Sequence, residues 1–488
     1  MPLPDHKTKI LATVGPASAA PDVMQALLRA GMNVARLNFS HGDFETHARW
    51  IRALRQASAA TGLELTLMAD LPGPKIRIGK LAQDPIELET GSTFSLTTDD
   101  TIGDATRASV SFERLPQVVK PGDMLFLNDG LVQLQVESVQ APQVRCRVIA
   151  GGELRSRKGV NLPGIDLGIP AFTPRDRECL QFALEQGVDA VSQSFVESAA
   201  DIDSVRQAAA ALGHAPFVIA KIERARALDQ ADAILGAADA IMIARGDLGV
   251  EVPIERIALI QKDLVRKAVR LGKPVITATQ MLESMTHSPQ PTRAEATDVA
   301  NAILDGTDCV MLSAESATGK YPVQAVATLA RIAAATEPHR SRANLWRQLE
   351  ALQGRTDFSM HDLLALGVEA VIENARAAAV VAPTRSGATA RSLTRFRLPM
   401  WILAPTAHLA TARQLAFSYG VHPIPVGDDL SDWTDFSRDH LRALGATGTV
   451  AVLVRGPSPL APGVNHGLEI IALERDSPPP AGVLPATR

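Results

Sequence analysis

Residues 216–251, PFVIAKIERARALDQADAILGAADAIMIARGDLGVE, contain two short apolar runs, and each run is followed at once by charged residues. The runs begin near Pro216 and Asp239 and have the length and composition of buried strands. A helical pattern separates them. Two buried strands joined through a helix are typical of a parallel sheet that is covered by helices. This stretch therefore predicts an α/β fold.

The same alternation extends from this stretch in both directions. Most strand-like runs are followed by a helical pattern such as PDVMQALLRAG (residues 21–31) or ERIALIQKDLVRKAVRLG (residues 255–272). The eight strand-like runs begin near Lys7, Asn33, Glu64, Asp189, Pro216, Asp239, Pro274 and Thr307. Eight strand-and-helix units predict a closed (β/α)₈ TIM barrel.

Two segments depart from this rhythm. Between about Pro72 and Asp166, Gly, Pro and Thr punctuate short alternating runs such as DMLFLND and VRCRVIAG, which predicts a small all-β domain. Strand and helix alternation resumes near Asp362, with candidate strands in AAAVVAP, MWILAP and GTVAVLVR, which predicts a separate α/β domain. The predicted domains are the first part of the barrel (1–72), an inserted β lid (73–166), the second part of the barrel (167–340) and a C-terminal α/β domain (355–476).

Composition narrows the class of protein. The chain has 488 residues, of which 46% are hydrophobic, and no apolar run approaches the roughly 18 residues that span a bilayer. A net charge of −4 without a basic run gives no reason to expect a nucleic-acid partner. The start of the chain does not resemble a secretory signal. Three widely spaced cysteines, Cys146, Cys179 and Cys309, fit a reducing compartment. We therefore expect a cytoplasmic protein without membrane association.

Polar residues alternate at the ends of several predicted strands, so that each set faces one side of its strand. Barrel enzymes place their chemistry at the carboxyl ends of the strands. A solvated strand end explains any single set equally well, but a shared cluster of charges inside a barrel is costly unless it has a function. The sets are Arg36, Asn38 and Ser40; Ser192 and Ser194; Lys221 and Glu223; and Thr277 and Thr279.

Two carboxylates follow consecutive predicted strands. Glu223 lies in AKIER and Asp247 lies in ARGDLGVE, and neither has a histidine or cysteine nearby in the sequence. Hard oxygen ligands of this kind favour Mg²⁺ or Mn²⁺ over zinc. The alternative is a structural pair of carboxylates bridged by Arg36 or Arg245.

Cations stand at the two hinges of the predicted insert. Arg77 lies in LPGPKIRIG, and Lys158 lies in RSRKGVNLPG. An insert that carries phosphate-binding charges could close over the mouth of the barrel. Either residue taken alone would ordinarily be a solvated surface cation.

Eight motifs follow one another along the chain: ARLNFSHG, DLPGPKIRIG, KGVNLPG, AKIER, IMIARGDLGVEVP, TATQMLESM, PTRAEATDVANAILDG and MLSAES. In this order they closely resemble the pyruvate kinase family. The resemblance runs from about Thr8 to Pro322 and continues more weakly to about residue 470. It implies a glycolytic enzyme that transfers the phosphoryl group of phosphoenolpyruvate to ADP and so forms pyruvate and ATP.

The resemblance also implies roles for residues at the substrate. Glu223 and Asp247 would hold the divalent ion, Lys221 would lie beside the transferring phosphoryl group, and Arg36 would bind the substrate phosphate. The backbone amides near Gly246 and Asp247 would bind the substrate carboxylate. Thr279 would lie close to the enolate carbon, and Ser194 would contact the substrate.

A nucleotide site and a monovalent-cation pocket follow from the same resemblance. Asn38, His41, Arg77 and Lys158 would contact the nucleotide, which brings a second Mg²⁺. The pocket positions are Asn38, Ser40, Asp70, Leu71 and Lys75. Many members have a threonine where Leu71 stands and a glutamate where Lys75 stands. Because the Lys75 ammonium can supply the missing positive charge, we expect no requirement for potassium. The alternative is an exposed lysine that faces solvent.

The C-terminal motif PTRSGATAR follows a predicted strand and opens a helix. The resemblance places a phosphorylated allosteric effector there, against Thr384, Arg385, Ser386, Gly387 and Thr389, with residues 455–469 closing over it. The alternative is a plain strand-to-helix turn capped by hydroxyl groups. The family also suggests a homotetramer.

Two other functions compete with this interpretation. Barrel dikinases and carbon–carbon lyases that act on phosphoenolpyruvate or pyruvate need a phosphorylated histidine or a catalytic cysteine loop, and no segment here supplies either. A ligand-sensing relative without activity would be expected to have lost site residues. Arg36, Lys221, Glu223, Asp247 and Thr279 are all present.

Overall fold

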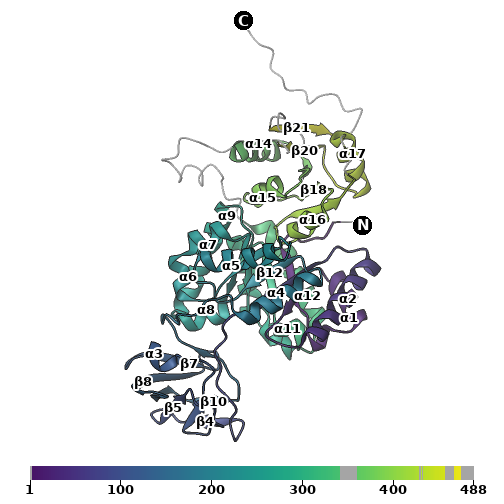
Figure 1. The fold of residues 1–488 in the computed structure, drawn as a ribbon. Coiled ribbons are helices and arrows are strands. Elements are labelled where there is room, and N and C mark those ends of the chain that lie inside the picture. Colours follow the sequence, from purple (N-terminus) through teal and green to yellow (C-terminus); the bar gives the residue numbers. More distant parts are fainter. Residues whose placement is uncertain (1–2, 341–359, 428–429, 431, 457–465, 474–488) are drawn as a thin grey trace. The chain divides into compact units, whose positions relative to one another are not determined.

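The computed structural model describes residues 3–340, 360–427, 430, 432–456 and 466–473. The chain divides into two compact units (Figure 1). One unit is Ile10–Leu329, which contains the barrel and its insert. The other unit joins Met1–Lys9 to Ala330–Arg488.

Eight parallel strands form a closed barrel, which confirms the predicted fold. Around the barrel the strands follow the order β1-β16-β15-β14-β13-β12-β3-β2. Each predicted strand is present, and nearly every strand residue is buried, as expected where helices cover a barrel and side chains fill its interior. The strands are β1 (Lys9–Thr13), β2 (Met32–Asn38), β3 (Thr66–Leu71), β12 (Ala190–Gln193), β13 (Phe217–Ile222), β14 (Ala240–Ala244), β15 (Val275–Ala278) and β16 (Cys309–Leu312).

The register of neighbouring strands places polar residues at one level. Asp70 on β3 pairs with Asn38 on β2 and with Ser192 on β12. Lys221 on β13 pairs with Met242 on β14. The polar ends of β2, β3, β12 and β13 therefore meet at the carboxyl end of the barrel.

Helices surround the barrel, and several begin at side chains that cap their first turn. Asp43 accepts a hydrogen bond from the Thr46 N–H at the start of α2, and Thr292 forms a capping box with Glu295 at the start of α10. α8 begins directly after β14, so its first turn lies at the barrel mouth. The helices are α1 (Pro21–Arg29), α2 (Phe44–Thr61), α4 (Pro174–Glu185), α5 (Ala199–Ala211), α6 (Ala225–Asp229), α7 (Ala231–Ala237), α8 (Arg245–Glu251), α9 (Ile257–Arg270), α10 (Arg293–Asp305), α11 (Ala314–Ala317) and α12 (Pro322–Thr336), with 3₁₀ turns η1 (Pro16–Ser18), η2 (Ile254–Arg256), η3 (Glu283–Thr286) and η4 (Glu337–His339).

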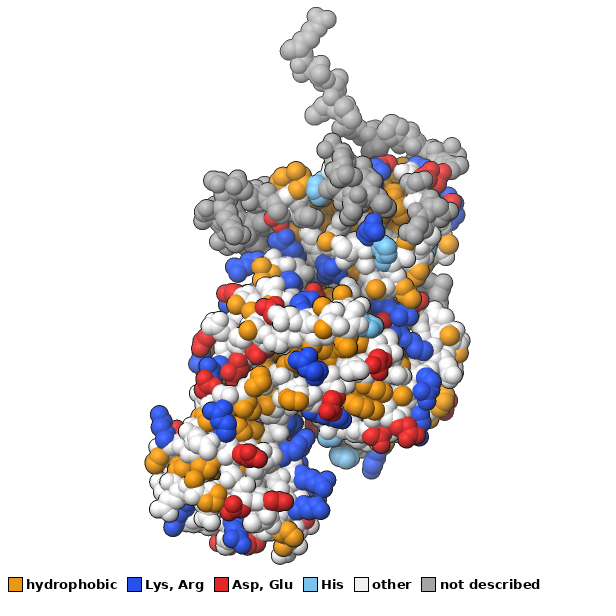
Figure 2. Space-filling model, viewed as in Figure 1, with side chains coloured by type: hydrophobic (Ala, Val, Ile, Leu, Met, Phe, Trp, Pro, Cys, Tyr) orange, Lys and Arg blue, Asp and Glu red, His pale blue; other side chains and the backbone are white. Residues whose placement is uncertain are grey.

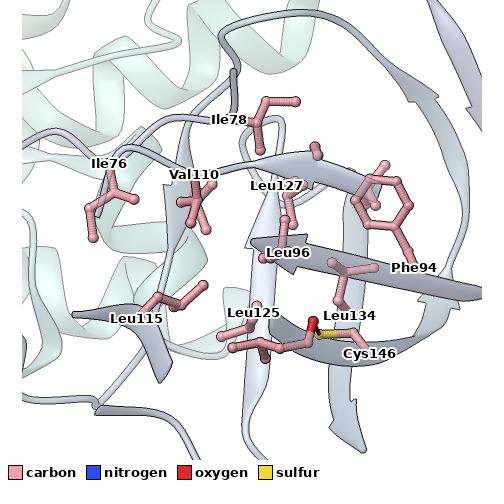
Figure 3. Close-up of a cluster of buried hydrophobic side chains, with 14 of the residues drawn as sticks. Ile76, Ile78, Phe94, Leu96, Val110, Leu115, Leu125, Leu127, Leu134 and Cys146 are labelled. Atoms are coloured by element: carbon pink, nitrogen blue, oxygen red, sulfur yellow. Dashed lines mark hydrogen bonds between the residues drawn. The ribbon is translucent and has the colours of Figure 1, made fainter. Parts of the chain in front are cut away.

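The insert between β3 and α4 is built on two sheets, with one short helix, α3 (Leu115–Val118). Its core side chains point toward one another between the strands (Figure 3). Phe94, Leu96, Leu125 and Leu134 are completely buried there, so the insert has a hydrophobic core of its own. The strands are β4 (Ile86–Leu88), β5 (Thr93–Thr97), β6 (Arg107–Ser109), β7 (Met124–Leu127), β8 (Val132–Gln140), β9 (Gln143–Ala150), β10 (Gly152–Leu154) and β11 (Val160–Asn161).

The C-terminal sheet has the strand order β19-β18-β17-β20-β21. All its pairs are parallel except the antiparallel pair of β20 with β21. The three predicted strands are present, and β19 and β21 are additional. Residues 457–465, most of the segment expected to cover the effector site, lie outside the described residues. The elements are α14 (Met360–Asn374), β17 (Ala377–Val381), α15 (Ala388–Thr394), β18 (Ile402–Thr406), α16 (Leu409–Leu415), β19 (Val421–Pro425), α17 (Trp433–Ala443), β20 (Val450–Arg455) and β21 (Gly467–Ala472).

The surface of the barrel mixes charges of both signs. Lys and Arg side chains lie among Asp and Glu side chains on the face shown in Figure 2. Within the described ranges, no helix is both long and apolar enough to cross a bilayer.

Candidate active site

Five polar residues from four strand ends meet at the barrel mouth. Arg36 and Asp70 lie near the ends of β2 and β3, and Ser194 follows β12. Lys221 lies near the end of β13, and Glu223 follows that strand. All five are buried. Arg36, Ser194, Lys221 and Glu223 therefore cluster as expected of the strand ends, whereas Asp70 was expected only in the monovalent-cation pocket.

Asp70 lies at the centre of the cluster. Its Oδ2 accepts hydrogen bonds from Nε and Nη2 of Arg36, the first at 2.8 Å, and its Oδ1 accepts one from the Ser192 hydroxyl at 2.7 Å. The Lys221 ammonium lies 3.3 Å from Asp70 Oδ1. Burial alone would raise the pKa of Asp70, but the charges of Lys221 and Arg36 outweigh it and hold that pKa below its usual value. Asp70 is therefore ionised and fixes both cations.

Lys221 is a buried ammonium with three partners. Besides contacting Asp70, its Nζ donates to the Ser194 hydroxyl at 2.7 Å and lies 2.8 Å from Glu223 Oε1. Burial favours the neutral amine, but the charges of Asp70 and Glu223 raise the Lys221 pKa above its usual value. The side chain therefore holds a positive charge at the barrel mouth with only 8% of its surface exposed.

Glu223 and Asp247 form a pair of carboxylates beside this lysine. Glu223 Oε2 accepts the Phe195 N–H at 2.8 Å, and Asp247 lies half-buried in the first turn of α8. Burial raises the pKa of Glu223, and the negative charge of Asp247 raises it further, against the opposing charge of Lys221. Two carboxylates that repel each other in a buried site fit a hard divalent cation, which would relieve the repulsion.

The arginines near this pair have other partners. Arg36 is bound to Asp70, and Nη2 of Arg245 lies 2.7 Å from Asp298 on α10. Neither arginine bridges Glu223 and Asp247. The alternative of a structural carboxylate pair held by arginine is therefore wrong for the described residues.

Thr279 follows β15 in an unusual backbone conformation. Its φ is +69° and that of Gln280 is +54°, a left-handed region that a β-branched residue rarely occupies. The Thr279 hydroxyl accepts the Gly246 N–H at 2.7 Å and donates to the Ala278 carbonyl at 2.6 Å. Arg245 donates to the Thr279 carbonyl and thereby holds the turn. The turn keeps the hydroxyl next to the start of α8.

Thr277, by contrast, does not join the cluster. Its hydroxyl donates to Thr307 at 3.0 Å, in a completely buried pair. The expected alignment of Thr277 with Thr279 is wrong, because β15 ends at Ala278 and the positive φ of Thr279 breaks the alternation of side chains.

Two contributors to the cluster were not predicted. Thr13 on β1 accepts a hydrogen bond from Nη1 of Arg36 at 2.9 Å. Phe195 has φ +58° and aims its N–H at Glu223. Thr13 ends a strand-like run, so its place at a strand end could have identified it as a site residue. The residue type of Phe195 does not indicate its positive φ.

The predicted nucleotide residues lie around the β2–α2 loop and the two hinges of the insert. Arg77 forms an isolated bridge with Gly159, so Lys158 adjoins Arg77 across the paired hinge segments. Burial lowers the pKa of His41, and the charges of Arg77, Lys75 and Arg36 lower it further. These cations therefore surround His41, a setting that suits an anionic ligand.

The five residues of the predicted monovalent-cation pocket differ in burial and in the partners of their polar atoms. Asn38 Oδ1 accepts the Ser40 N–H at 3.1 Å, and the Leu71 side chain is completely buried while its carbonyl accepts the Ser194 hydroxyl. Asp70 already binds cationic side chains. Lys75 is exposed, and its Cε lies 3.9 Å from the place where a Cβ on Gly159 would stand.

The turn between β17 and α15 has the predicted backbone form. Gly387 has φ +80° and donates its N–H to the Thr384 hydroxyl at 2.9 Å. The Ser386 hydroxyl accepts the Ala388 N–H at 3.4 Å, and the Arg385 carbonyl accepts the Thr411 hydroxyl at 2.7 Å. The hydroxyl groups of Thr384 and Ser386 thus cap the turn. The alternative of a plain strand-to-helix turn predicts the same contacts.

Comparisons with known proteins agree with this geometry. A family model described as "Pyruvate kinase, barrel domain" matches residues 5–326, and one described as "Pyruvate kinase, alpha/beta domain" matches residues 362–463. A pyruvate kinase of Thermococcus litoralis is 46% identical over 437 residues, which covers 88% of this chain and 91% of the relative. Pyruvate kinase 2 of a Synechocystis species is 46% identical, with 88% and 72% covered. A pyruvate kinase of Clostridium acetobutylicum is 41% identical, with 86% and 88% covered.

The family models together span most of the chain, and the strand ends that carry the buried cluster fall inside the first match. The relatives match 86–88% of this chain at 41–46% identity. The chain belongs to the pyruvate kinase family.

Proposed function

We propose that this protein transfers the phosphoryl group of phosphoenolpyruvate to ADP, forming pyruvate and ATP, with Mg²⁺ or Mn²⁺ as the divalent ion. The observation that carries the proposal is the buried Lys221 ammonium, held by Asp70, Ser194 and Glu223 at the barrel mouth. A fixed, desolvated positive charge stabilises the negative charge that develops on the substrate more strongly than a solvated one does.

Glu223 and Asp247 would hold the divalent ion. The described residues contain no group of three or more histidine, cysteine or acidic side chains that could hold a metal. Two carboxylates suit Mg²⁺, which usually keeps waters and takes further oxygens from its substrate. The bound ion would supply positive charge to the carboxylate and enolate oxygens of phosphoenolpyruvate.

Arg36 and Lys221 would act on the phosphoryl group. Arg36 would bind the substrate phosphate through its planar donors while Asp70 and Thr13 hold the guanidinium in place. Lys221 would lie beside the transferring group and offset the charge of the enolate. The first-turn amides of α8, at Gly246 and Asp247, would bind the substrate carboxylate.

Protonation of the enolate would take place near Thr279. Its hydroxyl would belong to the hydroxyl and water network that delivers the proton to the enolate carbon. Ser194 would contact the substrate from the carboxyl end of β12. Binding of the carboxylate to the Gly246 amide would release the Thr279 hydroxyl from its present acceptor role. The site need only align the reactants, neutralise charge and exclude water.

ADP would bind between the β2–α2 loop and the insert. Asn38 and His41 would contact it from the loop, and Arg77 and Lys158 from the hinges. The cations that surround His41 support a polyphosphate ligand, which carries a second Mg²⁺.

Activity would not require potassium. In the pocket formed by Asn38, Ser40, Asp70, Leu71 and Lys75, the leucine offers no side-chain oxygen and is buried. The Lys75 charge already acts on His41, so a tethered cation is present in the region where a loaded ion would otherwise be needed.

We further propose a phosphorylated allosteric effector at the turn formed by Thr384, Arg385, Ser386, Gly387 and Thr389. The left-handed Gly387 and the hydroxyl groups around it support an anion-binding turn. Adding sugar phosphates and AMP in turn to an activity assay tests this site. A fall in the phosphoenolpyruvate concentration at half-maximal rate is expected with one of them, and no response to any of them would contradict it.

The protein would be a cytoplasmic homotetramer. All three cysteines are free and buried, which fits a reducing compartment. Ile254 and Leu259, on η2 and α9, are 73% and 67% exposed, an apolar surface that suits contact between subunits. Light scattering of the purified protein tests the assembly, and a monomer at assay concentrations would contradict it.

Replacing the two carboxylates tests the proposed metal site. Glu223→Gln and Asp247→Asn should each raise the Mg²⁺ concentration for half-maximal activity by at least about tenfold, because each loses one anionic ligand. The melting temperature without metal should not fall in Asp247→Asn, because the repulsion of Glu223 is relieved.

The matched control is Glu64→Gln, which changes an exposed carboxylate just before β3. Activity of the unaltered protein, followed as pyruvate released from phosphoenolpyruvate and ADP, must depend on added Mg²⁺ or Mn²⁺. An unchanged metal dependence together with a lower melting temperature in both site variants would show that the carboxylates are structural.

A further inference from the structure

The β2–α2 loop is fixed by a histidine that the proposed chemistry does not use. His47 lies in the first turn of α2 with 1% of its surface exposed. One of its ring nitrogens, Nε2, lies 2.8 Å from the carbonyl oxygen of His41. A carbonyl oxygen only accepts, so Nε2 must carry the proton and donate it to this bond. His47 therefore holds the backbone of a residue in the proposed nucleotide site.

The other ring nitrogen has no role in hydrogen bonding. Nδ1 of His47 is buried and has no hydrogen-bond partner among the described residues. Burial lowers the pKa of His47, although the bond to the His41 carbonyl opposes this. A charged ring would also bury an N–H without an acceptor. The ring is thus neutral, with the single proton on the nitrogen that faces the loop.

Aromatic contacts fix the plane of the ring. His47 stacks on Phe39 with ring centroids 4.3 Å apart and an interplanar angle of 14°, and Trp50 meets it edge-on at 5.4 Å. Phe44 stacks on Phe182 of α4 at 4.4 Å, and these two rings lie 6.2 Å and 6.0 Å from Phe39. A donor held in this way cannot rotate away from the His41 carbonyl without breaking the stack.

The loop has a backbone conformation that favours glycine at Gly42 and an internal hydrogen bond at Asn38. Gly42 has φ +76°, and a Cβ at that position would lie 3.4 Å from Nε2 of His47. On the other side of the loop, Asn38 Oδ1 accepts the Ser40 N–H. The backbone between Asn38 and Gly42 is therefore held from both ends.

We propose that His47 is a positioning residue for the nucleotide: through the His41 carbonyl it sets the loop that presents Asn38 and His41 to the ADP phosphates. The inference rests on the proposed nucleotide site. His47 does not touch the ligand, so its loss acts through the geometry of the loop and is felt by ADP rather than by phosphoenolpyruvate.

Two substitutions separate the hydrogen bond from the ring. His47→Phe keeps an aromatic ring against Phe39 but removes the donor, and His47→Gln restores an N–H at a similar distance from the backbone. His47→Phe should raise the KM for ADP about tenfold, with kcat and the KM for phosphoenolpyruvate changed less than about twofold. His47→Gln should recover most of the affinity for ADP. His214→Phe, at an exposed position, is the matched control and should change nothing.

Gly42→Ala provides a second approach if His47→Phe does not fold. Gly42 is exposed, and its positive φ makes alanine shift the loop while His47 stays intact. It should also raise the KM for ADP selectively. An unchanged KM for ADP in His47→Phe, or equal losses in His47→Phe and His47→Gln, would overturn the proposal, as would equal increases in both KM values.

Calorimetric titration with Mg·ADP separates this inference from the proposed function. Weaker Mg·ADP binding by His47→Phe than by the unaltered protein supports the role of His47 even if phosphoenolpyruvate is not turned over. Activity of the unaltered protein with equal Mg·ADP binding by both proteins would refute the role of His47 and leave the proposed function standing.

Discussion

Asp70 explains why two cations can share one buried site. Arg36 and Lys221 both contact its carboxylate, and Glu223 neutralises Lys221 from the other side. With Asp247 included, three carboxyl groups stand against two cationic side chains. Carboxyl groups in excess of cationic side chains are consistent with the proposed divalent-cation site.

The sequence predicted the ligands of this site better than their partners. Lys221 and Glu223 stand two residues apart at a strand end, so their alignment followed from the period of a strand. The contact of Lys221 with Asp70 joins residues 151 positions apart. The two strands come into register because both pair with β12, which lies between them, and no local sequence pattern indicates this.

Lys75 gives a test with monovalent cations. The unaltered protein should be active in buffers that contain only bulky organic cations. It should gain little from potassium, because the Lys75 ammonium already places a positive charge near His41. Lys75→Glu should lose roughly tenfold in activity without potassium and recover only in part when potassium is added, since Leu71 cannot replace a hydroxyl ligand.

Lys80→Glu is the matched control, because Lys80 is also exposed and lies in the same hinge segment. Measurements at constant ionic strength separate a specific ion from general screening. Strong potassium activation of the unaltered protein would refute the tethered-cation account.

The strands could be predicted from the sequence, but the backbone conformation of the residues that follow them could not. Thr279 and Phe195 follow β15 and β12 with positive φ, and both aim polar groups into the site. Threonine and phenylalanine disfavour this conformation, so residue type argues against it. The surrounding structure imposes the strain, which is concentrated where the proposed chemistry takes place.

In the C-terminal sheet too, the sequence predicted some strands and missed others. β17, β18 and β20 are apolar runs and were predicted, but β19 has the sequence VHPIP. Two prolines normally exclude a central strand, and β19 tolerates them because it lies at the edge of the sheet. β21, an antiparallel strand, departs from the strand and helix rhythm that guided the prediction.

His422 on β19 should make this sheet sensitive to acid. Burial, together with the charges of Lys9 and His440, lowers the pKa of His422 to about 4. Above pH 6.5 the histidine is neutral in both the folded and the unfolded states. As the pH falls from about 6.5 to about 4 the unfolded state takes up the proton first, so stability is lost, up to about 3 kcal/mol in full.

His422→Gln should therefore lose less stability than the unaltered protein between pH 7 and pH 4.5, measured as melting temperature or denaturant midpoint. His339→Gln, at an exposed position in the same unit, is the control and should retain the loss. Identical pH profiles for His422→Gln and the unaltered protein would contradict the burial argument.

The hinges of the insert connect the site to the rest of the barrel unit. Nη1 of Arg226, on α6, lies 2.7 Å from Asp166 at the second hinge, and Arg77 pairs with Gly159 between the hinges. The exposed Arg226–Asp166 pair can open at small cost. The two hinge segments stay together, because Ile78 donates its N–H to the Lys158 carbonyl at 2.9 Å and Val160 donates its N–H to the Ile76 carbonyl at 3.0 Å. Arg77 and Lys158, the proposed nucleotide contacts at the hinges, are therefore held next to each other on paired segments.

The architecture of the whole chain was the most predictable feature. Eight strand-and-helix units, a β insert and a second α/β region each produce a period or composition that extends over many residues. The site depends instead on side chains from four strands, and its exact contacts follow from closure and register. The sequence could therefore name the residues of the site but not the network that fixes them.

The most direct test of the central claim is the turnover of phosphoenolpyruvate and ADP by Lys221→Met at saturating Mg²⁺. The substitution keeps the length of the side chain and removes the charge beside the developing enolate. Turnover should fall on the order of 10²- to 10³-fold, with the Mg²⁺ dependence largely kept. Lys120→Met, at an exposed position of the insert, should match the unaltered protein. Near-normal turnover in Lys221→Met would contradict the account.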